Sequence, residues 1–192
     1  MTLTDRLIAP QATRAEVCLG FSAAIGGAAT AFALSIAAGW SWITVAVVVV
    51  IAFDIFGGAV VNAMSSAKRW YHRPGRTSVH HLGFVAVHVQ PFILAAVVPG
   101  FDWLAAAVIY AVALAGAVIV TVSPEALRRP IAFAATAFGL VAVTSLITMP
   151  HELMWFSPLL LIKLLLAHLL PENTADQDRP DLPGLATGTA TA

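Results

Sequence analysis

The chain has 192 residues, of which 59% are hydrophobic and 10% charged, and its formal net charge is zero. A mean hydropathy of +0.88 and so few charges exclude an ordinary soluble domain, in which about 25% of residues are charged. The balanced charge gives no reason to expect binding to nucleic acid. We therefore expect a multi-pass integral membrane protein of the cell membrane, built from helices.

Six apolar runs have about the 20 residues that a helix needs to cross the hydrocarbon core of a bilayer. In chain order they are approximately Val17 to Ala38, Trp42 to Met64, His80 to Val98, Trp103 to Val122, Ile131 to Met149 and Leu153 to Leu170. Residues 1–172 are therefore predicted to form one all-α domain of six transmembrane helices. Residues 173–192 are rich in Asp, Pro, Gly, Thr and Ala, so we expect a disordered cytoplasmic tail.

The basic residues fall on one side of these six runs, apart from Lys163, which lies inside the last run. The residues on that side are Arg6, Arg14, Lys68, Arg69, Arg73, Arg76, Arg128, Arg129 and Arg179. The three opposite links contain no Lys or Arg. The positive-inside rule therefore predicts that both termini lie in the cytoplasm.

The first run has small residues on one helical face, namely Gly20, Ala24, Gly27 and Ala31. In lipid, such residues allow two helices to approach closely, so this face is predicted to be a packing seam. Ionisable residues lie inside the second, third and sixth runs. We accordingly assign the first, fourth and fifth runs to the scaffold and the other three to the functional site.

Asp54, His88 and Lys163 lie within about one helical turn of the same depth in these three runs. A charge at the bilayer centre costs roughly 2.5–3.5 kcal/mol, so it needs a partner or a cavity and commonly marks a functional site. We predict that the three residues meet and are catalytic, with Asp54 donating or accepting a proton beside Lys163 and His88 as its partner group. The structural alternatives are an ion pair that only fixes helix packing and, for His88, an interhelical hydrogen bond.

A stripe of polar residues leads from Asp54 through Asn62 to a basic loop on the cytoplasmic side. Arginine forks and a lysine in this loop are suited to a phosphate headgroup. The predicted substrate-binding residues are Asn62, Lys68, Arg69, His72, Arg73 and Arg76. The alternative is that these cations only anchor the loop at the membrane surface.

Histidines and a carboxylate near the cytoplasmic ends of the third and sixth runs form a candidate metal site. The candidate ligands are His80, His81, His168 and Glu172. These ligand types suit Zn or Fe, so a divalent metal is a candidate cofactor. The spacing argues against it, because the chain has no His-x-x-x-His or His-Glu-x-x-His motif and neighbouring His80 and His81 point about 100° apart on a helix.

Together these residues predict a small membrane enzyme that isomerises, cyclises or hydrolyses a lipid or isoprenoid substrate by acid/base chemistry. Its site would open to the cytoplasmic side, and its partners would be membrane lipid and a hydrophobic small molecule. Proton-coupled, small-solute or metal transport through the same Asp, His and Lys is the alternative, and a non-catalytic scaffold is the third. Outward of Asp54, the second run has no polar residue except Thr44, which favours the enzyme.

Overall fold

The structure is a computed structural model that describes residues 9–171. Within this range the chain forms helices and no β-strand, which confirms the all-α prediction. The helices are α2 (Arg14–Ala37), α3 (Trp42–Ala63), α4 (Ser65–Tyr71), α5 (Ser78–Ala86), α6 (Gln90–Val97), α7 (Trp103–Val122), α8 (Glu125–Ser145), the 3-10 helix η1 (His151–Leu153), α9 (Phe156–Leu161) and the π-helix η2 (Ile162–His168). The predicted disordered tail lies outside the described residues.

Five helical segments are long and apolar enough to cross a membrane. They are Arg14–Ala37, Trp42–Ala63, Ser78–Val97, Trp103–Val122 and Glu125–Ser145. Large apolar side chains stand on their outer faces, for example Leu104 and Phe138, which are 75% and 77% exposed. Apolar residues exposed at this density are stable in contact with lipid rather than with water. These are the features of an integral membrane protein.

The predicted sixth span is built differently from the other five. The six residues of α9 and the seven of η2 are together shorter than the roughly 20 residues of a full crossing. Their leucines fill the centre of the molecule, where Leu160, Leu161, Leu164 and Leu165 are buried. Apart from Lys163 and His168 the buried side chains of η2 are apolar, and a largely apolar helix enclosed by other helices is a core element.

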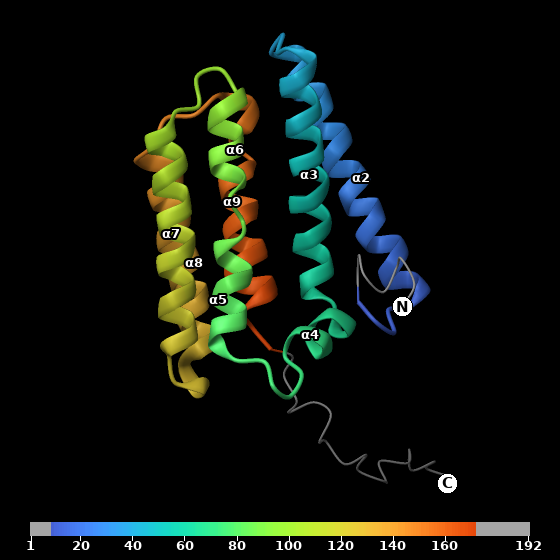
Figure 1. The fold of residues 1–192 in the computed structure, drawn as a ribbon, viewed down its shortest axis with the longest axis vertical. Helices are drawn as coiled ribbons and strands as arrows, with labels where there is room; N and C mark the ends of the chain where they lie inside the picture. Colours follow the sequence, from blue (N-terminus) through green and yellow to red (C-terminus); the bar gives the residue numbers. More distant parts are fainter. Residues whose placement is uncertain (1–8, 172–192) are drawn as a thin grey trace, which may run out of the picture.

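The other helices are arranged around this central column (Figure 1). α3 contacts α9 and η2 on one side, and α7 and α8 contact them on the other. α2 packs along α3 at the edge of the molecule, and α5 and α6 lie over the column in the view of Figure 1. The molecule therefore consists of two helical pairs, α2–α3 and α7–α8. The α9–η2 column lies between the pairs, with α5 and α6 in front of it in the view of Figure 1.

The small-residue face of α2 is buried against α3, as the sequence predicts. The buried residues of α2 are Gly20, Ala24, Gly27, Ala31 and Ser35. A Cβ atom added to Gly27 would lie 2.2 Å from Cγ of Phe56, and one added to Gly57 would lie 2.8 Å from Cβ of Ala24. Glycine is therefore required where the two helices approach most closely.

The third predicted span is divided into α5 and α6 by residues 87–89. Pro91 stands in the first turn of α6, and because it has no N–H it cannot continue the hydrogen-bond ladder of α5. At the break the N–H of His88 donates to the carbonyl of Val85 at 3.1 Å instead of to that of Phe84. The carbonyl of Phe84 is thereby left available for a side chain.

Candidate functional site

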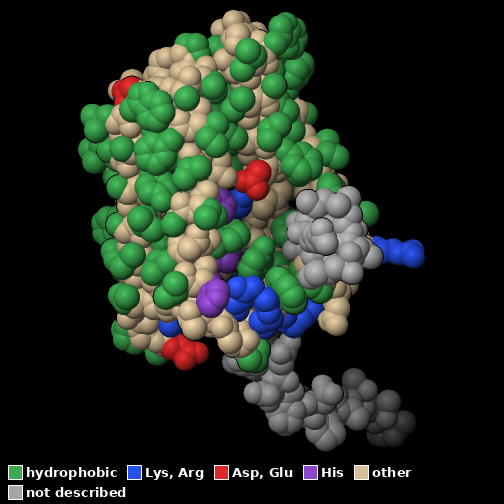
Figure 2. Space-filling view, viewed as in Figure 1, with side chains coloured by type: hydrophobic (Ala, Val, Ile, Leu, Met, Phe, Trp, Pro, Cys, Tyr) green, Lys and Arg blue, Asp and Glu red, His purple; other side chains and the backbone are tan. Residues whose placement is uncertain are grey.

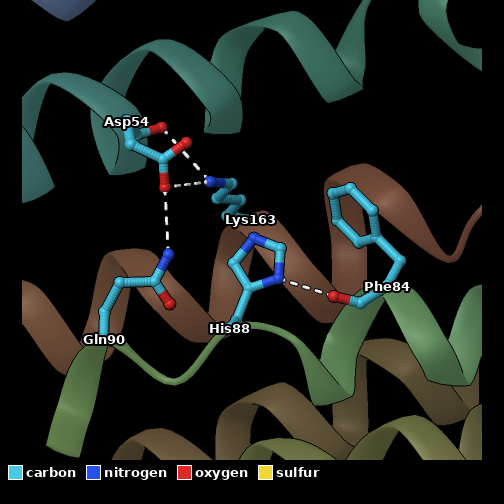
Figure 3. Close-up of polar contacts among 5 residues, drawn as sticks. All are labelled: Asp54, Phe84, His88, Gln90 and Lys163. Atoms are coloured by element: carbon cyan, nitrogen blue, oxygen red, sulfur yellow. Dashed lines mark hydrogen bonds and ion pairs between the residues drawn. The ribbon is translucent and has the colours of Figure 1, made fainter. Parts of the chain in front are cut away.

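An ion pair joins α3 and η2 in the middle of the molecule (Figure 3). Nζ of Lys163 lies 2.7 Å from Oδ2 of Asp54 and also donates to the main-chain carbonyl of Asp54 at 3.2 Å. The lysine side chain is 3% exposed and that of Asp54 is 51% exposed. The ammonium group is therefore enclosed by protein, whereas the carboxylate stands at an open edge.

Gly58, one turn after Asp54 on α3, makes room for the lysine. A Cβ atom on Gly58 would lie 2.5 Å from Cε and 2.7 Å from Nζ of Lys163. The end of the lysine side chain thus lies against bare helix backbone, which is how a long side chain from η2 reaches a carboxylate on α3.

Gln90, the first residue of α6, also binds the carboxylate. Its Nε2 donates to Oδ2 of Asp54 at 3.2 Å, while its Oε1 is buried with no hydrogen-bond partner in the described part of the chain. One carboxylate oxygen therefore accepts hydrogen bonds from two elements, and an amide oxygen nearby is unused. Sequence reasoning missed Gln90, although a polar residue directly before Pro91 in an apolar run was a usable signal.

His88 stands at the break between α5 and α6, with its ring fixed by the carbonyl that the break leaves available. Its Nδ1 lies 2.6 Å from the carbonyl oxygen of Phe84, which can only accept, so Nδ1 carries the hydrogen. In the neutral ring Nε2 is then a hydrogen-bond acceptor. Figure 3 shows this second nitrogen on the side of the ring that faces Lys163. The three predicted catalytic residues are thus brought to one place, and their catalytic role stays a prediction.

These groups line a cavity of about 480 Å³. Its lining residues are Gly20, Phe21, Ala24, Phe53, Asp54, Gly57, Gly58, Val61, Asn62, Tyr71, Phe84, Val87, His88, Gln90 and Lys163. Acidic, basic and histidine side chains meet in the middle of the face shown in Figure 2, below an upper part that is mainly hydrophobic. An apolar cavity with a few convergent polar groups is the usual form of a small-molecule site. Because α2 supplies part of the wall, its assignment to the scaffold alone was too narrow.

Asn62 lies deep in the same cavity, nearer to α4 than Asp54. Its side chain is buried, and its Nδ2 has no hydrogen-bond partner in the part of the chain that the structure describes. A buried donor without a partner is costly, and a polar group of a ligand would satisfy it. Asn62 is therefore the predicted substrate-binding residue whose position fits that role most directly.

The predicted basic residues are spread over separate places. Lys68 donates to a main-chain carbonyl near the end of the described chain at 2.5 Å, and it lines a different cavity from that of Asp54. The guanidinium of Arg73 stacks over the ring of Trp70 at 3.7 Å. Arg69 and Arg76 are exposed. None of these four cations is among the described residues that line the cavity of Asp54.

Three histidines, His72, His81 and His168, lie close together beside the cavity of Asp54. Nδ1 of His81 lies 3.3 Å from Nε2 of His168, and Nε2 of His72 donates to the main-chain carbonyl of His168 at 3.0 Å. The rings of His72 and His81 stack with centroids 4.6 Å apart. Burial is the largest influence on the imidazole of His72 and lowers its pKa, so this ring is neutral near pH 7. The ring of Phe84 stacks on His168 at 3.8 Å and contacts His88 at 4.7 Å, so it lies between the histidine cluster and the cavity.

Of the four predicted metal ligands, the structure brings His81 and His168 together. His80 points elsewhere, because its Nδ1 accepts hydrogen bonds from the N–H and hydroxyl of Thr77 and so caps α5. Glu172 lies outside the described residues. Among residues 9–171 no three or more His, Cys, Asp or Glu side chains are arranged to hold a metal ion. With Glu172 not described, the Zn or Fe site stays a prediction.

The chain matches no protein-family model, no curated protein and no solved structure. No function can therefore be transferred from a relative. The ion pair, the free nitrogen of His88 and the cavity between them are the grounds on which a function can be inferred.

Proposed function

We propose that this protein is a small enzyme of the cell membrane that acts on a lipid or isoprenoid substrate by acid/base chemistry in the Asp54 cavity. The observation that carries the proposal is a half-exposed carboxylate, paired with an enclosed ammonium group, at the edge of an apolar cavity. A carboxylate that faces hydrocarbon is costly unless a polar group covers it. The polar end of an amphipathic substrate would do so.

The route by which such a substrate enters follows from the charges. The described cations other than Lys163 lie at the end of the molecule where α2 begins and α4 lies, and basic side chains gather at that end in Figure 2. Under the positive-inside rule this end would lie in the cytoplasm together with both termini, and the α9–η2 column would then be a sixth, enclosed crossing. Asn62 and Tyr71 line the cavity toward the same end. The substrate would therefore enter from the cytoplasmic leaflet.

The arrangement can both remove and supply a proton. Nε2 of His88 would accept a proton from the substrate, since Nδ1 already holds its hydrogen against a carbonyl. The imidazolium so formed would return that proton to another carbon, directly or through the carboxylate of Asp54, whose charge Lys163 would stabilise from 2.7 Å away. Removal of a proton from one carbon and addition to another is an isomerisation, and apolar walls would exclude water from it.

Transport through the same residues has less support. Outward of Asp54, the only polar residue of α3 is Thr44, and its hydroxyl already donates to the main-chain carbonyl of Val97 at 2.9 Å. The core at that level is apolar and includes the buried side chains of Val48, Ile51 and Leu94. A polar path thus extends from the cavity in one direction only, which suits an enzyme better than a transporter.

The test is conversion of lipids by the purified protein in lipid nanodiscs, followed by mass spectrometry. Wild-type protein should convert one class of polar lipid or isoprenoid, and Asp54→Asn should lower the rate by about 100-fold or more because it removes a proton-transfer group. Asp102→Asn is the matched control. Asp102 caps α7, accepting from the N–H of Ala105 at 2.7 Å, and asparagine caps a helix equally well.

Three results would count against the enzyme. Absence of turnover by wild-type protein on a full lipid extract would remove the catalytic part of the proposal. An equal loss in the Asp54 and Asp102 variants would show that the effect is not local to the cavity. Asp54-dependent uptake of protons or solute into sealed vesicles, without any lipid product, would establish the transport alternative instead.

A further inference from the structure

A second cavity, of about 580 Å³, lies between α3, α4, η2 and the first turns of α8. It shares no lining residue with the Asp54 cavity. It stands at the basic end of the molecule, which is the proposed cytoplasmic surface, and so at the depth of lipid headgroups. The reaction proposed for Asp54 assigns it no role.

Basic side chains predominate among the described residues that line this second cavity. Lys68, Arg128 and Arg129 line it, and Glu125 is the one carboxylate among its lining residues. Nε of Arg128 is buried and has no hydrogen-bond partner within residues 9–171. A buried guanidinium donor without a partner is unfavourable, and phosphate oxygens are the acceptors that match its geometry.

The position of the two arginines on α8 points in the same direction. Arg128 closes the first turn of a helix that begins at Glu125, where the helix macrodipole is positive and disfavours cations, and Arg129 follows it directly. A bound anion would relieve the repulsion between the arginines and the helix end, and would also accept from Nε of Arg128.

The remaining walls are apolar and fit a hydrocarbon chain. Phe133 of α8 and Ile162 and Leu166 of η2 line the cavity on the side away from the basic end of α8. We propose that this cavity binds an anionic lipid, with its phosphate group between Arg128, Arg129 and Lys68 and its chain against Phe133, Ile162 and Leu166. The combination of phosphate ligands with an apolar wall favours a lipid over a soluble phosphate.

The experiment measures lipid binding to the delipidated full-length protein in a neutral detergent, by native mass spectrometry and by the shift in melting temperature. The probes are phosphatidic acid, phosphatidylcholine and inorganic phosphate. Phosphatidic acid should bind and raise the melting temperature, because a ligand that binds only the folded state stabilises it. Arg129→Gln, a change at an exposed position, should weaken this binding by about tenfold, and Arg128→Gln by at least as much.

Arg14→Gln is the matched control, because Arg14 is exposed at the same end of the molecule and lines neither cavity. Its affinity for phosphatidic acid should equal that of wild-type protein. An equal loss in Arg14→Gln would overturn the site, because net charge alone would then explain binding. Unchanged binding in folded Arg129→Gln and Arg128→Gln would also overturn it. Equal stabilisation by inorganic phosphate at the same concentration would overturn the assignment to a lipid.

Discussion

At the scale of single residues, Asp54 and Lys163 form one ion pair but stand in very different surroundings. The ammonium group is enclosed, whereas half of the carboxylate side chain is exposed at the cavity. Loss of the acid would leave a buried cation with a main-chain carbonyl but no counter-charge, and loss of the base would leave an anion that other polar molecules can still reach. The two halves of the pair should therefore differ in what their removal costs.

Asp54→Asn should lower the free energy of unfolding by about 3 kcal/mol or more, because an unpaired buried charge is strongly destabilising. Lys163→Met should cost less, roughly 1–2 kcal/mol, because methionine fills a similar volume and the remaining carboxylate is half exposed. The double variant should recover part of the loss. Unfolding by titration with SDS in mixed micelles, followed by circular dichroism, measures all three. Strictly additive effects would show that the two side chains do not interact in the protein.

Residue-scale prediction from sequence worked where depth alone was sufficient. Asp54 and Lys163 have comparable depth in their runs, and the structure pairs them. Gln90 escaped prediction because its orientation depends on the break at residues 87–89, which turns α6 relative to α5. Lys68 was grouped with Arg73 and Arg76 because they share a loop, whereas short α4 directs Lys68 to another cavity. Residues that are close in sequence need not line the same cavity when the segment between two spans contains a short helix such as α4.

At the scale of elements, helices α2 and α3 show how closely packing depends on single methyl groups. Gly26 and Gly27 are neighbours on α2, but a Cβ atom on Gly26 meets nothing within 4 Å, whereas one on Gly27 would overlap the ring of Phe56. The same chemical change at two adjacent positions therefore tests the packing directly.

Gly27→Ala should destabilise the protein by about 1–3 kcal/mol, because Phe56 or the whole of α2 must move to admit the methyl group. Gly26→Ala should be neutral or stabilising by up to about 1 kcal/mol, because alanine is the better helix former. The same SDS titration compares the two variants. Equal effects at both positions would mean that α2 does not pack on α3 through Gly27.

Element boundaries were predicted best where both ends carry turn residues. The run Trp103 to Val122 coincides with α7, and Trp42 to Met64 ends one residue beyond α3. By contrast, α8 begins at Glu125 rather than near Ile131, with Pro130 in its second turn. A proline this near to a helix start removes little of the hydrogen-bond ladder, so the helix passes through it. The short α9 and η2 could not be distinguished from a lipid-facing span, because hydropathy does not report what surrounds an apolar helix.

At the scale of the whole molecule, the described residues provide five candidate crossings and a shorter central column. An odd number of crossings would place the two ends of the chain on opposite sides of the membrane. With the column as a sixth crossing they lie on the same side, as the distribution of basic residues requires under the positive-inside rule. The side on which the chain emerges after the column decides between these two arrangements, whereas the loops before the column report the orientation of the first five crossings.

Cysteine labelling in intact cells measures that orientation. In a Cys18→Ser background, a cysteine at Arg76 should resist an impermeant maleimide until the cells are opened, whereas one at His151 should react at once. Both positions are exposed in the structure, so a difference in reactivity reports the side of the membrane. The opposite pattern would invert the topology, and reaction of both cysteines in intact cells would mean that α5–α6, α7 and α8, which lie between them, do not make three crossings.

The looser winding of η2 has a consequence for the register of the chain. Lys163 and His168 are five residues apart, and on a regular α-helix they would point about 140° away from each other. In a π-helix each N–H donates to the carbonyl five residues earlier, which lowers the rotation per residue and so reduces that angle. Lys163 can therefore reach Asp54 while His168 reaches His81. If one residue between Lys163 and His168 were deleted, this leucine-rich segment could form an ordinary α-helix. In that chain the two side chains would be four residues apart and about 40° apart around the helix, so both could keep their partners. The π-helix therefore accommodates one extra residue while Lys163 and His168 stay on the same face of the segment.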